Sequence, residues 1–200
     1  MWDRKSSEEK VSGVSHRISL LLQMKAALKI KRFKKVGFFF NPREKNSDII
    51  WKKLQNISKV MNFDIVIFPC PPGTNRVMKF LKQIVNKNVV VDMVYLPLDS
   101  FIVSNASLIG KQLRIAKIMS MGAQKEYIDS GALLGITPDY YQLGKAASKI
   151  LDRHQHGEKL GRIPIQTVQK PKLLINEKTR KLLNIKIPDK LLKGATIIDK

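Results

Sequence analysis

The run KKVGFFF at residues 34–40 decides the fold class of this 200-residue chain. Its apolar side chains are continuous rather than alternating, and it ends at Asn41-Pro42. This pattern predicts a strand that is buried on both faces, as in a parallel sheet. Apolar residues at helical spacing predict a helix over residues 18–30 before it and another from Asn46 to about Met61 after it.

The same alternation of strand and helix continues along the chain. Further strands are predicted over 64–68, 93–96, 117–121, 132–136 and 173–175, and further helices over 74–86, 100–116, 124–130, 140–157 and 177–183. Alternating strands and helices indicate βαβ units with right-handed crossovers, which place helices on both faces of the sheet. The sequence therefore predicts an α/β fold with a mainly parallel sheet in a three-layer sandwich.

Polar residues at the ends of the predicted strands are the candidates for a binding site, because ligands of such sheets bind outside the carboxyl ends of the strands. The first strand is followed by Asn41, Glu44, Asn46 and Ser47. Amide groups at the helix start could take a ligand carboxylate, and Glu44 could take an ammonium group. The alternative is that Asn46 or Ser47 only caps the helix and Glu44 is solvated.

Two later strand ends carry acidic residues. Asp99 and Ser100 follow the strand at 93–96, where Asp99 either caps the next helix, contacts a cationic group, or does both. Asp139 follows the strand at 132–136 and can cap the helix after it. Tyr140 and Tyr141 come next, and either of them stacks on a ligand or packs against the fold.

The formal net charge of +21 brings polyanions into consideration as partners. The lysines are dispersed, however, and most fall on predicted helix faces, with no RNA-reading aromatic motif, zinc finger or basic tail. A solvated Lys-rich surface is the favoured interpretation, and no nucleic-acid partner is expected. A basic nucleic-acid-associated α/β protein is kept as the alternative.

Sequence patterns of catalysis and metal binding are missing. Cys70 is the single cysteine, which excludes a disulfide framework within the chain and a Cys-based metal site, and it is expected to be a small residue at a strand end. His154 and His156 do not share a helix face. The sequence predicts no enzyme, no metal and no cofactor, although an α/β enzyme or the sensor domain of a regulator forms a third class.

Several short segments occur together in a characteristic order. They are Val11-Ser12-Gly13-Val14-Ser15, Asn41-Pro42-x-Glu44-x-Asn46-Ser47, Tyr95-x-Pro97-x-Asp99-Ser100, Gly131-Ala132-Leu133, Asp139-Tyr140-Tyr141-x-Leu143-Gly144, Ile163-Pro164-Ile165-Gln166-Thr167, Leu174-Ile175-Asn176 and Ile187-Pro188-x-x-Leu191-Leu192. This ordered set resembles a family of extracytoplasmic ABC-transporter substrate-binding proteins whose best-understood members take up tryptophan or tyrosine.

The resemblance implies a type I periplasmic-binding fold and a small zwitterionic solute, such as an aromatic amino acid, in a cleft between two lobes. It implies a transporter permease as partner and an extracytoplasmic location, although this chain shows no signal peptide and would be cytoplasmic if expressed as given. The ligand-binding residues expected from it are Asn41, Glu44, Asn46, Ser47, Asp99, Ser100 and Asp139.

Family chains are about half as long again, so the resemblance implies that this chain is truncated at its N-terminus. Residues 1–13 are expected to be a tail and crossover, 14–136 the ligand-facing C-terminal lobe, and 137–200 the return segments of an incomplete N-terminal lobe. The return segments carry apolar faces, expected at Ala146, Ala147, Ile150, Leu151 and 173–175. Exposed apolar faces of this kind predict self-association and weak or no solute affinity.

Overall fold

A computed structural model describes residues 11–167 and 170–199 of the chain, which divides into two compact units. The larger unit contains Ser19–Thr137 and Leu173–Lys200. The smaller unit contains Pro138–Lys172 and the segment before Ser19. Each unit is described by itself below.

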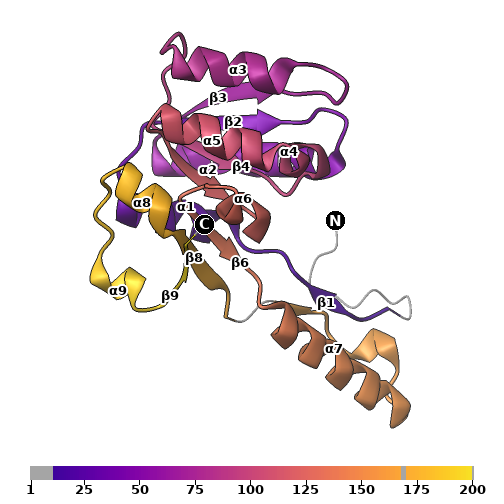
Figure 1. Ribbon diagram of the computed structural model, residues 1–200. Coiled ribbons are helices and arrows are strands. Elements are labelled where there is room, and N and C mark those ends of the chain that lie inside the picture. The colour runs from indigo at the N-terminus through magenta and orange to yellow at the C-terminus, as the bar shows by residue number, and fades with distance from the viewer. Residues whose placement is uncertain (1–10, 168–169, 200) are drawn as a thin grey trace. The chain divides into compact units, whose positions relative to one another are not determined.

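A seven-stranded sheet forms the centre of the larger unit, in the order β3-β2-β4-β5-β6-β8-β9 (Figure 1). The strands are β2 (Lys35–Phe40), β3 (Asp64–Pro69), β4 (Met93–Leu96), β5 (Met119–Gly122), β6 (Leu134–Thr137), β8 (Lys172–Asn176) and β9 (Ala195–Ile198). Pairing is parallel between β2 and β3, β2 and β4, β4 and β5, β5 and β6, and β8 and β9. The predicted α/β fold with a mainly parallel sheet is confirmed.

Burial explains why these residues form strands. In β2, Val36, Phe38 and Phe39 are fully buried, and all four residues of β4, β5 and β6 are buried. Gly37 lies inside β2 because a side chain there would not fit. A Cβ at this position would lie 2.7 Å from Cε2 of Phe68 on the neighbouring strand. The continuous apolar run of the sequence therefore corresponds to a sheet covered on both faces.

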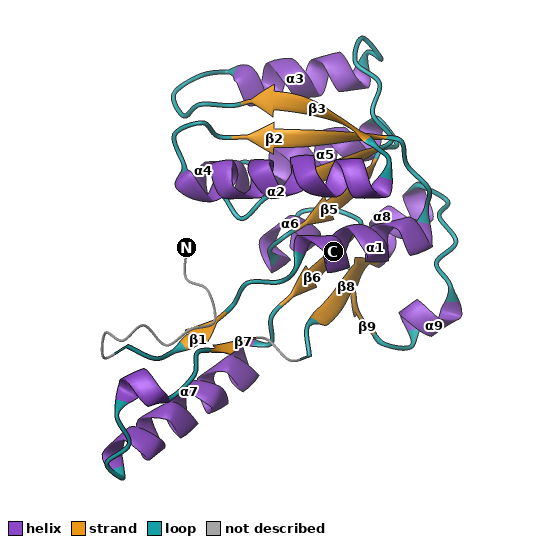
Figure 2. Ribbon diagram, turned by 180° about the vertical axis from the view of Figure 1, so that it is seen from behind, coloured by secondary structure: helices purple, strands orange, loops and turns teal. Residues whose placement is uncertain are grey.

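Helices cover both faces of this sheet. Figure 2 shows α1 (Leu20–Ile30) and α2 (Lys45–Met61) on one face, and Figure 1 shows α3 (Arg76–Val85) and α5 (Ala106–Ile115) on the other. Two short helices, α4 (Ser100–Ser104) and α6 (Lys125–Asp129), follow β4 and β5. The single helix predicted over 100–116 is broken at Asn105, whose Nδ2 donates to the Phe101 carbonyl at 2.9 Å.

The strand order reverses at β2. The strand that follows β2 in the chain, β3, pairs on one side of it, and the next strand, β4, pairs on the other side. The connections after β2 and β4 therefore separate at the carboxyl edge of the sheet. Such a topological switch point opens a crevice in which doubly wound α/β proteins bind their ligands.

The strand expected over 173–175 is present as β8 and belongs to the larger unit. Strand β8 lies beside β6 and buries Leu174 and Ile175, and β9 extends the sheet beyond it. The following helix, α8 (Glu177–Leu182), begins with Asn176, whose side chain accepts from the Thr179 amide at 2.8 Å and donates to the Ile128 carbonyl at 2.8 Å. These bonds fix β8 and α8 to the sheet.

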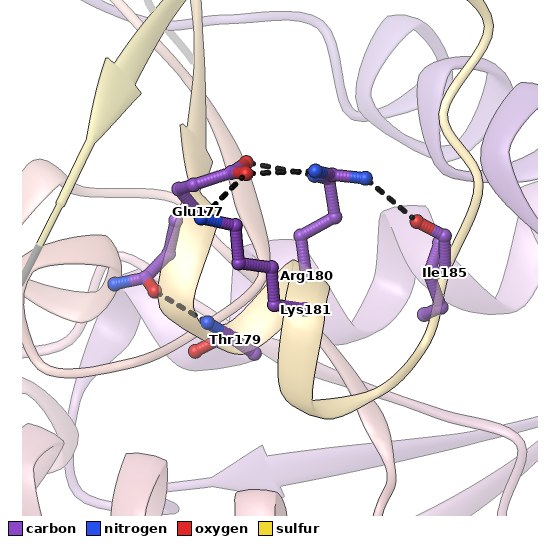
Figure 3. Close-up of polar contacts among 6 residues, drawn as sticks. Glu177, Thr179, Arg180, Lys181 and Ile185 are labelled. Atoms are coloured by element: carbon purple, nitrogen blue, oxygen red, sulfur yellow. Dashed lines mark hydrogen bonds and ion pairs between the residues drawn. The ribbon is translucent and has the colours of Figure 1, made fainter.

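Figure 3 shows the polar contacts made by residues of α8. The Arg180 guanidinium makes two hydrogen bonds of 2.7 Å to the Glu177 carboxylate, and Lys181 lies 3.6 Å from the same group. Thr179 Oγ1 donates to the Gly131 carbonyl at 2.9 Å, which ties the helix to the loop before β6. A short helix, α9 (Asp189–Leu192), precedes β9.

The smaller unit contains a two-stranded parallel sheet and one long helix. Strand β1 (Val14–Ser15) pairs with β7 (Gln166–Thr167), and α7 (Tyr140–Gln155) is followed by the 3-10 turn η1 (Leu160–Arg162). The apolar residues of α7 divide between buried and exposed positions. Leu143 and Ile150 are buried, but Ala147 and Leu151 are exposed. A spacing of seven residues, from Leu143 to Ile150, is what one narrow helix stripe requires.

Candidate functional site

The two connections at the switch point are joined by side-chain hydrogen bonds. Ser47 Oγ, in the first turn of α2, donates to Asp99 Oδ2 at 2.5 Å. The Ser100 amide donates in the opposite direction, to Glu44 Oε2, at 3.0 Å. Four of the predicted site residues therefore meet at the carboxyl edge of β2 and β4, within the larger unit.

Asp99 caps α4, which is one of the roles that its sequence position allowed. Its Oδ1 accepts from the Ile102 amide at 2.8 Å while its Oδ2 accepts from Ser47. With both oxygens engaged and only 1% of the residue exposed, Asp99 fixes the turn after β4. A contact between its carboxylate and a ligand stays a prediction.

Asn41 is buried and stabilises the loop after β2 by hydrogen bonds to the loop backbone. Its residue is 3% exposed, and its Oδ1 accepts from the Arg43 amide at 3.0 Å. Its carbonyl accepts from the Glu44 amide at 3.2 Å, so the turn closes around Asn41-Pro42. Asx turns of this kind rigidify a loop through the side chain and hold the residues after it in place. Glu44 is positioned by this turn.

The start of α2 is open, contrary to the predicted alternative of a cap from Asn46 or Ser47. Both residues lie inside the first turn, and Glu44 occupies the N-cap position without a side-chain cap bond. The first helical bond runs from the Asp48 amide to the Glu44 carbonyl at 3.3 Å. The amides of Lys45, Asn46 and Ser47 precede that bond, at the positive end of a 17-residue helix. Lys45 and Asn46 are exposed whereas Ser47 is buried, so the amides of Lys45 and Asn46 form the donor group that suits an anion.

The start of α4 offers few free donors. The Ser100 amide is bound to Glu44 and the Ile102 amide to Asp99. The helix also has only five residues, so its dipole is small. An anion at this edge is therefore better matched to α2 than to α4, and the exposed side chain of Ser100 remains available for a polar contact.

Tyr127 is a site residue that the sequence did not reveal. Its hydroxyl donates to the Pro97 carbonyl at 2.8 Å, two residues before Asp99, and its ring lies against Gly122, where a Cβ would clash with it. Burial raises the pKa of Tyr127 well above its usual value, and the negative charges of Asp99 and Glu44 act in the same direction. The phenol therefore stays protonated and keeps its bond. No sequence pattern distinguishes a tyrosine that bonds a distant carbonyl in this way from a tyrosine that only packs in a helical turn.

Cys70 directly follows β3 at the same edge, as expected for a small residue at a strand end. It is fully buried, and its amide donates to the Phe40 carbonyl at 2.7 Å. Burial raises the pKa of the thiol to about 12, and the charge of Asp99 adds to this while Arg76 opposes it. A thiol with this pKa is neutral near pH 7 and does not act as a nucleophile.

Asp139 lies in the smaller unit and has structural partners. Its Oδ1 accepts from the Tyr141 and Gln142 amides at 3.1 and 3.3 Å, which caps α7, and its Oδ2 pairs with Lys172 at 2.9 Å. The hydrogen bond from Lys172 holds the pKa of Asp139 below its usual value. Tyr140 and Tyr141 are both exposed, so neither packs into a core as one of the two interpretations proposed.

Comparison with known proteins supplies the family. A family model described as "ABC transporter substrate binding protein" matches residues 2–198, almost the whole chain. The chain belongs to this family. The predicted family is confirmed, and it is a family of transport proteins rather than of enzymes. Within the described residues, no group of three His, Cys, Asp or Glu side chains is gathered to hold a metal.

One curated relative is a "Tyrosine-binding protein" from Clostridioides difficile strain R20291. It is 30% identical to this chain over 177 residues, which cover 88% of the chain and 50% of the relative. The chain therefore spans about half the length of the curated relative that it matches.

Solved structures share the fold at lower identity. A ligand-free, open substrate binding protein with adhesive properties from Clostridium difficile has a TM-score of 0.82 at 22% identity, over 95% of this chain and 63% of the other. A conserved domain protein from Vibrio cholerae has a TM-score of 0.80 at 22% identity, over 98% and 65%. An ABC domain from Streptococcus pneumonia in complex with L-Trp has a TM-score of 0.74 at 21% identity, over 94% and 65%.

Proposed function

We propose that this chain is the solute-binding component of an ABC importer and that it takes a small zwitterionic solute, such as an aromatic amino acid, for delivery to a permease. The family supports the transport role. The relative named as a tyrosine-binding protein and the fold shared with a protein bound to L-Trp support the class of solute. Enclosure of the solute in a cleft between two lobes is part of the proposal, because two-lobed binders close around their ligand.

The observation that carries the proposal is the combination of charges at the start of α2. The open amides of the exposed residues Lys45 and Asn46 suit a carboxylate, and Glu44 is the neighbouring residue on the chain. An α-amino acid carries its ammonium and carboxylate on one carbon, so its two charges fit a donor group and an acceptor group that lie side by side. We propose that Glu44 receives the ammonium group.

The remaining predicted residues have different proposed roles in the same site. Asn41 and the Ser47–Asp99 pair hold the frame, because their polar atoms are buried and already bonded. Asn46 and Ser100 are exposed and supply side-chain contacts to the solute. Asp139 stays a proposed ligand contact on the resemblance alone. Rigid side chains behind a binding group are what keep it in a productive geometry.

A thermal-shift comparison of tyrosine with two matched analogues tests this function on this chain joined to the unmatched half of the tyrosine-binding relative, because this chain spans only half of that relative and is expected to bind weakly by itself. Tyramine lacks the carboxylate and 3-(4-hydroxyphenyl)propionate lacks the ammonium group, while both keep the phenol ring. We expect tyrosine, tryptophan or phenylalanine to raise the melting temperature with the logarithm of ligand concentration, and both analogues to leave it unchanged. A shift by tyramine equal to that by tyrosine would refute the carboxylate site, and the absence of a shift by any amino acid would refute the proposed function.

A further inference from the structure

Many lysine and arginine residues lie at the edge of the larger sheet opposite the candidate site. Since the strands are parallel, the connections that precede β3, β2, β4 and β5 lie next to one another at the amino edge, across about 15 Å at the usual strand spacing. These connections, the first residue of β2 and the last turns of the preceding helices carry Lys29, Lys31, Arg32, Lys34, Lys35, Lys59, Lys82, Lys87, Arg114 and Lys117. We call this set, with the loops that carry it, the amino-edge surface.

Few carboxylates oppose these cations within the described part of the chain. None of them takes part in the ion pairs found among residues 11–167 and 170–199. The two carboxylates at this edge are Asp64 and Asp92. Asp92 is used by the backbone, because its Oδ2 accepts from the Lys34 and Lys35 amides at 2.7 and 2.8 Å. The surface therefore keeps a large positive charge.

Exposed aliphatic side chains lie among these cations. Val60 at the end of α2 is 82% exposed, Val90 in the loop before β4 is 63% exposed, and Ile115 at the end of α5 is 57% exposed. Each of them is within three residues of a lysine in the chain, namely Lys59, Lys87 or Lys117. Exposed apolar side chains close to lysines are typical of surfaces that lie in the interface of a lipid bilayer.

Two of the lysines occupy backbone conformations that usually select another residue. Lys87 and Lys117 follow the ends of α3 and α5 with φ values of 59° and 55°, in the left-handed region. Glycine or asparagine is favoured there, and asparagine is found in the same conformation after α2, at Asn62. Lysine is less favourable than glycine or asparagine for the backbone at both positions, but it adds a positive charge at this edge.

We propose that the amino-edge surface binds an anionic phospholipid bilayer, with Val60, Val90 and Ile115 entering the headgroup region and the lysines contacting lipid phosphates. Lysine clusters are attracted to anionic leaflets, and the aliphatic groups add an apolar contribution that a nucleic acid would not provide. The exposed large aromatic side chains of the described residues, Tyr140 and Tyr141, belong to the smaller unit, so bases have no stacking platform at this edge. Because the candidate solute site lies at the opposite edge of the same sheet, bilayer contact leaves it free.

Vesicle sedimentation of the full chain tests the proposal. Vesicles of phosphatidylcholine with phosphatidylglycerol should bind the chain at low salt, release it at high salt, and bind it far more strongly than vesicles of phosphatidylcholine alone. The triple variant K59Q/K87N/K117N should lose about 100-fold in partitioning, at about fivefold for each lysine. Asparagine is chosen for the two left-handed positions so that the backbone is not strained.

The matched control is K53Q/K79Q/K111Q, which removes three exposed lysines from the middle of the same helices α2, α3 and α5. It removes the same net charge, and we expect a loss of less than fivefold. The variant V60S/V90S/I115S keeps all charges and should lose at least tenfold. Circular dichroism checks that each variant is folded. Equal losses from the two lysine triples, full binding by the valine and isoleucine variant, or binding of duplex DNA without binding to vesicles would overturn the proposal. None of these outcomes depends on solute binding.

Discussion

Ser47 and Asp99, 52 residues apart in the chain, share a hydrogen bond of 2.5 Å at the switch point of the sheet, and neither residue is more than 1% exposed. This bond couples the start of α2 to the cap of α4. The open amides of α2 and the Glu44 carboxylate are thereby held on one rigid frame, which is the structural basis for a site that recognises two opposite charges.

Removing the Ser47 hydroxyl should destabilise the protein through the buried carboxylate that it leaves without a donor. We expect S47A to lower the free energy of unfolding by about 1–3 kcal/mol, since Asp99 stays buried with one oxygen unsatisfied. The control is S58A, in the same helix, where the hydroxyl donates only to the Gln55 carbonyl. That variant should change stability by less than about 0.5 kcal/mol in urea unfolding. Equal effects of the two substitutions would contradict the role of the buried bond.

Two glycines inside helices should respond to alanine with opposite signs. In α5, a Cβ at Gly110 would run into the Ser130 carbonyl, so G110A should cost about 1–3 kcal/mol. In α7, a Cβ at Gly144 meets nothing within 4 Å, so G144A should stabilise its helix by about 0.5–1 kcal/mol. Urea unfolding followed by circular dichroism measures both, and a stabilising G110A would show that the close packing of α5 on that loop is wrong.

Asp92 should give a pH-dependent contribution to stability. Burial raises its pKa, but the hydrogen bonds from the Lys34 and Lys35 amides, with the charges of Lys31 and Lys35, outweigh burial and hold the pKa below its usual value. A carboxylate with a lowered pKa stabilises the fold fully above its unfolded pKa of about 3.9, and the contribution is lost as the pH falls through the folded value.

The variant D92N should therefore be less stable than the natural chain by about 1 kcal/mol at pH 7. The difference should shrink below about pH 4, where Asp92 takes up its proton. Urea titrations of both proteins between pH 7 and pH 3 check this, and a difference that stays constant over the whole range would show that the charge of Asp92 contributes nothing.

The Cys70 thiol should be unreactive in the folded protein. It is fully buried and its pKa is raised to about 12, so both access and thiolate are lacking at pH 8. We expect a thiol reagent such as 5,5′-dithiobis(2-nitrobenzoate) to label it only at the rate of unfolding, and rapidly in urea. Fast labelling without denaturant would mean that the end of β3 opens readily.

The sheet and its helices could be predicted from periodicity, because each strand of the core is buried on both faces and therefore continuous in apolar character. The short elements could not. Strands β1 and β7 have two residues each, and the place of β8 beside β6 depends on tertiary contacts such as that of Asn176 with Ile128. Sequence periodicity also did not separate the buried Leu143 and Ile150 of α7 from its exposed Ala147 and Leu151.

For the candidate site, sequence position identified which residues lie at the strand ends but not which hydrogen bonds and helix caps each of them forms. Whether Asp99 caps a helix depends on where the Ile102 amide points, and whether α2 is capped depends on Glu44 turning to Ser100. These are choices between local partners that cost similar free energies, so only the folded arrangement decides between them. Tyr127 shows the same limit, since its bond to the Pro97 carbonyl joins residues 30 positions apart.

The central claim, that Glu44 binds the ammonium group of an amino acid, is tested most directly by calorimetric titration of tyrosine into the natural chain, E44Q and the control D64N, each joined to the unmatched half of the tyrosine-binding relative. Glutamine keeps an oxygen that can accept from the Ser100 amide, so E44Q removes the charge and spares the frame. Asp64 is exposed at the amino end of β3, at the opposite edge of the sheet. The account predicts that E44Q weakens tyrosine binding about ten- to hundredfold while D64N leaves it unchanged. Equal affinity of E44Q and the natural chain for tyrosine would contradict it.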